Sequence, residues 1–148
     1  MIDGETNRLV LLGASNVSLG WQPLLRSVMR RFGGRVDVLT AHGLGRAYLS
    51  PSYFGIRRAP AILDSELWNE LSSDGARPSP EAALITDLGN DLVYGQRPEN
   101  LLEAARTAIV RLREANPECR IVVTRPPLDS VETLTLSRFY LFRSVLFP

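Results

Sequence analysis

Lysine is absent from this chain of 148 residues, and histidine and cysteine occur once each, as His42 and Cys119. A single cysteine excludes an internal disulfide, and these two residues together fall short of the ligand set of a structural zinc site. Without lysine there is no P-loop of the Walker type, and no Gly-x-Gly-x-x-Gly pattern follows the first apolar run, as a dinucleotide site requires. We therefore expect neither a cofactor nor a metal ion.

Long hydrophobic runs are also missing, because no stretch approaches the roughly 18 apolar residues that a membrane-spanning helix needs. Residues 1–8 are polar and acidic, unlike a secretory signal peptide. The formal net charge is only +1, and the 17 basic residues, all arginine, are scattered along the chain. Such a charge gives no bulk attraction to nucleic acid or to an anionic membrane. We expect a cytoplasmic protein with neither as a partner, and the sequence leaves its oligomeric state open.

Short apolar runs alternate with amphipathic segments along the chain. These patterns predict strands at residues 8–12, 36–41, 82–88 and 120–124, and helices at about residues 24–32, 61–71, 98–112 and 131–146. Such an alternation is typical of a parallel sheet with helices on both faces. We predict a single domain over residues 1–148 with a flavodoxin-like three-layer α/β/α fold. The irregular segment 43–60 predicts a functional loop.

The end of the chain is unusually apolar over residues 141–148. A doubly wound sheet normally has one more strand beside the fourth. We therefore expect that the natural protein continues and that the last strand and helix of the domain are missing from these residues.

Polar turns that contain glycine follow the first three predicted strands, at residues 13–16, 42–46 and 89–91. In an open parallel sheet, ligands bind outside the carboxyl ends of the strands, where the connections leave in opposite directions. Because the three turns end neighbouring strands, we expect them to converge. The sequence therefore predicts a functional site at this edge of the sheet.

The same three segments carry a resemblance to a known family. Residues 12–20, Leu-Gly-Ala-Ser-Asn-Val-Ser-Leu-Gly, resemble the first block of the SGNH (GDSL-type) hydrolases, whose usual form is Gly-Asp-Ser. Residues 87–92, Asp-Leu-Gly-Asn-Asp-Leu, resemble the third block, commonly Gly-x-Asn-Asp, and residues 42–46 are similar to the glycine-bearing second block. The resemblance covers the chain from Arg8 onward. It implies a serine esterase that acts on a small-molecule ester or acetylated substrate through an acyl-enzyme.

Carried over by position, the resemblance implies roles for three residues. Ser15 would be the nucleophile, and its own main-chain N–H would be one donor to the oxyanion. Gly45 would give a second main-chain N–H, and Asn90 a third donor through its side-chain amide. Because the alignment of the second block is loose by one residue, Arg46 is an alternative to Gly45.

This sequence departs from the family pattern in several places. Ala14 replaces the usual Asp, Gly20 lies one residue later than usual, and Leu88 stands where the third block has Gly. The final block, Asp-x-x-His, which supplies the general base, does not occur in the chain. We therefore expect the 148 residues alone to be inactive. The alternative function is an inactive module of the same fold that binds a small ligand or a partner.

Two further points stay open on the sequence. His42 follows a predicted strand, a place where a lone histidine is more often a structural hydrogen-bonding group than a base. Tyr48, Tyr53 and Phe54 of the segment 43–60 either line a substrate pocket or pack this loop onto the core.

Overall fold

The computed structural model describes residues 6–33, 35–54, 56–72, 77–125, 135 and 137. Strands and helices alternate along most of this chain, as the apolar pattern predicts. The elements are β1 (Asn7–Leu12), α1 (Ser15–Leu19), α2 (Trp21–Phe32), β2 (Val36–Ala41), β3 (Ser52–Phe54), β4 (Arg57–Ala59), the 3₁₀ helix η1 (Ile62–Asp64), α3 (Leu67–Ser72), β5 (Pro80–Ile85), α4 (Asn90–Val93), α5 (Pro98–Ala115) and β6 (Arg120–Val123).

The central sheet is parallel, with the strand order β2-β1-β5-β6. Strand β1 lies inside the sheet, and its apolar run is buried because helices cover both faces. Leu12 at the end of β1 is in register with Ala41 of β2 and with Ile85 of β5. The carboxyl ends of these three strands are therefore level at one edge. Strand β2 lies on one side of β1 in the sheet, and β5 lies on its other side. The strand order therefore reverses direction between β1 and β5.

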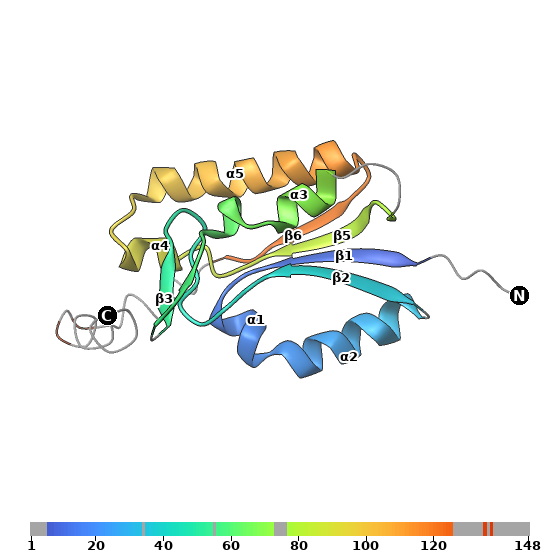
Figure 1. Cartoon of the computed structure of the whole chain (residues 1–148), viewed down its shortest axis with the longest axis horizontal. Helices are drawn as coiled ribbons and strands as arrows, with labels where there is room; N and C mark the ends of the chain where they lie inside the picture. Colours follow the sequence, from blue (N-terminus) through green and yellow to red (C-terminus); the bar gives the residue numbers. More distant parts are fainter. Residues whose placement is uncertain are drawn as a thin grey trace, which may run out of the picture.

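The sheet lies between two layers of helices. Helices α1 and α2 lie on one face, and α3 and α5 lie on the other (Figure 1). The predicted three-layer α/β/α fold with a central parallel sheet is therefore confirmed.

Helix α5 illustrates how the apolar pattern builds the core. Ala104, Ala108 and Leu112 lie four residues apart on one face and are buried against the sheet, while Leu102 on the outer face is 63% exposed. Within the part of the chain that the structure describes, no helix combines the length and the apolar character needed to cross a membrane.

The predicted strands at 8–12, 36–41 and 120–124 and the predicted helix at 24–32 agree with β1, β2, β6 and α2 to within a few residues. The prediction at 98–112 is likewise confirmed, since α5 begins at Pro98 and runs to Ala115. Pro23 is the third residue of α2, as required of a proline in a helix. The predicted helix at 131–146 lies outside the described residues except at positions 135 and 137.

Three predictions need correction. The segment 61–71 is not one helix, because Ser65 is extended (ψ 151°) and separates η1 from α3, with its hydroxyl donating to the carbonyl of Ile62. The third strand ends at Ile85 instead of residue 88, since Asp87 has a left-handed φ of 61° that no strand accommodates. The segment 43–60 is only partly irregular, because β3 and β4 pair within it as an antiparallel hairpin.

Candidate functional site

The turns that follow β1, β2 and β5 lie at the carboxyl edge of the sheet. Figure 1 shows α1, α4 and the β3–β4 hairpin gathered at this same end of the molecule. Hydrogen bonds between main-chain groups continue past the strand ends, from Gly13 N–H to the carbonyl of Ala41 and from Thr86 N–H to the carbonyl of Leu12, at 3.1 and 3.0 Å. The first residues of the turns are therefore held against one another.

Ser15 is the first residue of α1, directly after the turn that ends β1. Its side chain is half-buried, and no other described residue is hydrogen-bonded to its hydroxyl. The turn before it depends on Gly13. A Cβ at this position would lie 2.5 Å from Cγ2 of Val17 and 2.6 Å from Cγ2 of Thr86, too close for any side chain. The backbone can therefore turn tightly against β5 only because residue 13 is glycine.

Asp87 connects the turn after β5 to the turn that carries Ser15. Its Oδ2 accepts a hydrogen bond from the main-chain N–H of Ala14 at 2.6 Å, and its Oδ1 accepts one from Nδ2 of Asn16. The carbonyl of Asp87 in turn accepts from the N–H of Asn90 at 3.2 Å. The sequence predicted no role for Asp87. Its contact with Ala14 spans 73 positions and leaves no local signal.

The loop after β2 presents Gly45 in a left-handed conformation, with φ of 67°. The N–H of Arg46 donates to the carbonyl of Gly43 at 3.2 Å and closes a turn, whereas no described residue accepts from the N–H of Gly45. The hydroxyl of Tyr94 donates to the carbonyl of Gly45 at 2.8 Å and holds this loop from α4. Of the two alternatives for a main-chain donor, the N–H of Gly45 is the one still available.

Asn90, the first residue of α4, joins the second and third turns. Its Nδ2 donates to the carbonyl of Arg46 at 3.0 Å. A side-chain amide has two N–H groups, and no described residue accepts from the other. The same amide therefore fixes the loop of Gly45 and retains one donor.

Asp91 follows Asn90 and is completely buried. Its carboxylate accepts from the N–H groups of Tyr48 and Leu49, at 2.7 and 2.9 Å. Burial raises the pKa of this carboxyl, while the main-chain N–H groups of residues 48–50 act in the opposite direction. Sequence reasoning included Asp91 in the third block but missed this role, in which one carboxylate organises the segment that follows the Gly45 loop.

Tyr48 packs into the core beneath the turns and is not a pocket residue. Its side chain is completely buried, and its hydroxyl lies 3.1 Å from the carbonyl of Leu12 and 2.8 Å from that of Thr86, at the ends of β1 and β5. Burial raises the pKa of the phenol. Tyr53 in β3 is instead 54% exposed, and the side chain of Phe54 lies outside the described part.

His42 is held by groups of the protein itself. Its Nδ1 lies 2.8 Å from the hydroxyl of Ser18, and its ring stacks on Trp21 with 4.9 Å between ring centroids. These contacts agree with the structural role expected from its position at a strand end. Burial, and secondly the charge of Arg46, lower the pKa of His42.

The lowered pKa predicts a pH dependence of stability. The unfolded chain binds the imidazole proton more readily than the folded chain, so the contribution of His42 is complete above its unfolded pKa of about 6.5 and is lost as the pH falls through the lower folded pKa. We expect the unfolding free energy of the native protein to fall between about pH 7.5 and about pH 5.5 by more than that of His42→Gln. Urea denaturation at both pH values measures this difference. Equal losses in the two proteins would contradict it.

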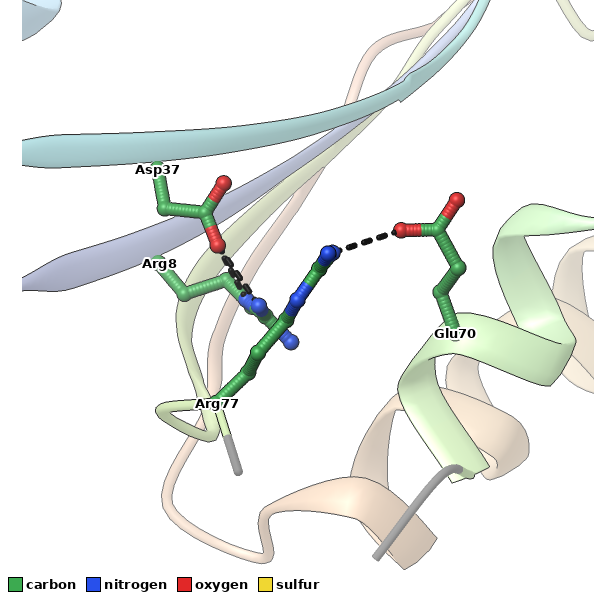
Figure 2. A network of polar contacts seen from close by, with 4 residues as sticks. All are labelled: Arg8, Asp37, Glu70 and Arg77. Atoms are coloured by element: carbon green, nitrogen blue, oxygen red, sulfur yellow. Dashed lines mark hydrogen bonds and ion pairs between the residues drawn. The ribbon is translucent and has the colours of Figure 1, made fainter. Parts of the chain in front are cut away.

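A cavity of about 720 Å³ opens at the opposite edge of the sheet and is lined in part by arginines. Arg8 pairs with Asp37 across β1 and β2 at 2.6 Å, and Arg77 pairs with Glu70 of α3 at 3.0 Å (Figure 2). Arg111 of α5 donates to a main-chain carbonyl of η1 at 2.6 Å. These arginines are already engaged within the protein, so the candidate site is the carboxyl edge. In the described ranges no group of three or more His, Cys, Asp or Glu side chains could hold a metal ion.

The carboxyl edge therefore unites the segments of all three predicted site residues. Hydrogen bonds link the Ser15 turn to Asp87, Asp87 to Asn90, and Asn90 to the loop of Gly45. No protein-family model and no curated protein matches this chain.

Proposed function

We propose that this protein is a serine acyl hydrolase that cleaves a small-molecule ester or acetyl group, with Ser15 as the nucleophile. The observation that carries the proposal is the chain of hydrogen bonds that joins the three turns through Asp87 and Asn90. The segments that it joins offer the hydroxyl of Ser15, the N–H of Gly45 and the second amide N–H of Asn90, none of which is hydrogen-bonded to a described residue. A nucleophile beside several donors is the arrangement that acyl transfer requires.

In the proposed reaction the hydroxyl oxygen of Ser15 attacks the substrate carbonyl and gives up its proton to a base. The carbonyl oxygen becomes an oxyanion, for which the N–H groups of Ser15 and Gly45 and the side chain of Asn90 are the donors. Collapse releases the alcohol, which takes up the proton and leaves an acyl-enzyme. Water then attacks the acyl-enzyme, which releases the acid and restores the hydroxyl of Ser15.

This reaction needs a base beside Ser15, and the contacts of His42 are with Ser18 and Trp21. We therefore propose the activity for the product of the complete reading frame, with a base from outside the described residues beside Ser15.

Covalent labelling tests the proposal. We expect a fluorophosphonate probe to modify the product of the complete reading frame at Ser15, as mapped by peptide mass spectrometry. Ser15→Ala should abolish this labelling and lower the hydrolysis of an acetyl ester by at least about 10³-fold, because no other group takes over the attack. Ser27→Ala, an exposed serine in α2, is the matched control and should leave both unchanged. Labelling that persists in Ser15→Ala would refute the assignment.

A binding module that does no chemistry is the second candidate. Two observations favour it. No described residue contacts the hydroxyl of Ser15 as a catalytic base would, and Ala14 and Leu88 depart from the pattern of the family that the sequence resembles. The same donors would bind a carboxylate without reacting. Amide chemical shifts of Ser15 and Gly45 that respond to acetate, in a protein that hydrolyses no ester, would favour this module over the enzyme.

A further inference from the structure

We propose that Asp87 is a positioning residue that fixes the orientation of Ser15 from the neighbouring strand, an inference that rests on the proposed function. The carboxylate of Asp87 holds the residues immediately before and after Ser15. Oδ2 accepts from the N–H of Ala14 at 2.6 Å, and Oδ1 accepts from the side-chain amide of Asn16. The nucleophile therefore lies between two groups that are bound to one carboxylate.

The position of Asp87 is itself fixed by the end of the sheet. The N–H of Thr86 donates to the carbonyl of Leu12 at 3.0 Å, and the hydroxyl of Thr124 donates to that of Thr86 at 2.7 Å. Asp87 then adopts a left-handed φ of 61°, which aspartate tolerates better than most residues. This backbone conformation turns the chain out of β5 at the point where its side chain meets the turn after β1.

The two contacts need acceptor atoms at position 87. Both partners are N–H donors, and a carboxylate offers an oxygen to each. Alanine offers none, so Asp87→Ala loses both contacts. Asparagine would keep both, because the side-chain amide of Asn16 can turn over and present its oxygen to the new NH₂ group.

Loss of the two contacts should act on the reaction through Ser15. A displacement of a reacting atom by about 1 Å costs about 10²-fold in rate. We expect Asp87→Ala to lower the rate at which the fluorophosphonate probe labels Ser15 by about 10- to 100-fold. Asp64→Ala, which removes an exposed carboxylate in η1, is the matched control and should label at the native rate.

Exchange of the two partners provides the decisive variant. In the double variant Asp87→Asn with Asn16→Asp, the amide at position 87 donates to a carboxylate at position 16 while its oxygen accepts from Ala14. The cross-turn contact returns with its polarity reversed. Asn16→Asp alone places two carboxylates against each other and should slow the labelling of Ser15, and the added Asp87→Asn should restore it.

The test compares the native protein, Asp87→Ala, Asn16→Asp and the double variant, each made as the product of the complete reading frame. Labelling rates and melting temperatures are measured for all four. The inference predicts that the double variant recovers to within about threefold of the native rate. A role in stability alone would leave the labelling rates equal wherever all four proteins are folded, and labelling that Asp87→Ala does not slow would overturn the inference while the proposed function stands.

If the proposed function itself is wrong, the result is different: the native protein shows no labelling of Ser15. Hydrogen exchange at the amide of Ala14 then decides whether Asp87 holds this turn. The exchange should accelerate at least about tenfold in Asp87→Ala and stay near the native rate in the double variant, whose amide oxygen still accepts from Ala14. Unchanged exchange would overturn the role of Asp87 independently of any activity.

Discussion

Asp91→Ala should lower the free energy of unfolding by about 3–4 kcal/mol, the largest effect on stability that we expect from this site. The carboxylate is completely buried and accepts from the main-chain N–H groups of Tyr48 and Leu49. Alanine leaves these donors without an acceptor where water has little access. Removal of a buried charge returns part of the cost, because burial disfavours the ionised carboxyl, as its raised pKa indicates. Urea denaturation near neutral pH measures the change.

The matched control for this prediction is Asp64→Ala. Asp64 is exposed at the end of η1, so its removal should change the unfolding free energy by less than about 0.5 kcal/mol. If Asp91→Ala were as mild as Asp64→Ala, the two amide contacts would not organise the loop as we describe.

Asn90→Ala should slow the phosphonylation of Ser15 and the hydrolysis of an acetyl ester by about 10²–10³-fold in the product of the complete reading frame. The proposed reaction loses a side-chain donor to the oxyanion. It also loses the bond from Nδ2 of Asn90 to the carbonyl of Arg46, which holds the loop of Gly45. A donor in a site of this kind stabilises the transition state more than the ground state, so kcat should fall more than KM rises.

Asn69→Ala is the control for this change, because Asn69 is an exposed residue of α3 near the opposite edge of the sheet. We expect native rates in this variant. A loss in Asn90→Ala that appears only as a higher KM would assign Asn90 to substrate binding and not to the oxyanion.

The spacing of apolar residues predicted the strands and helices whose buried faces follow that spacing. The run that forms β1 is buried on both faces, and α5 carries buried residues at helical spacing, so burial and sequence agree. The segment 61–71 shows the limit of this reasoning. Its apolar residues fit a helix, yet Ser65 bonds its hydroxyl to the carbonyl of Ile62 and adopts an extended backbone that breaks the segment in two.

The sequence predicted the part of the candidate site that depends on where the strands end. The turns of Ser15, Gly45 and Asn90 were expected to converge because parallel strands end at a common edge. The carboxylates that hold these turns were not predicted. Asp87 contacts Ala14 across 73 positions and Asp91 contacts Tyr48 across 43, and no spacing within one segment encodes such contacts.

The roles proposed for Ser15, Gly45 and Asn90 depend on whether one oxygen atom can reach all their donors. A crystal structure of the phosphonylated protein measures this directly. We predict phosphorus bonded to the hydroxyl oxygen of Ser15, and a phosphoryl oxygen about 2.7–3.1 Å from the main-chain nitrogens of Ser15 and Gly45 and from Nδ2 of Asn90. A phosphoryl oxygen that meets none of these nitrogens, or an adduct on another residue, would contradict the account.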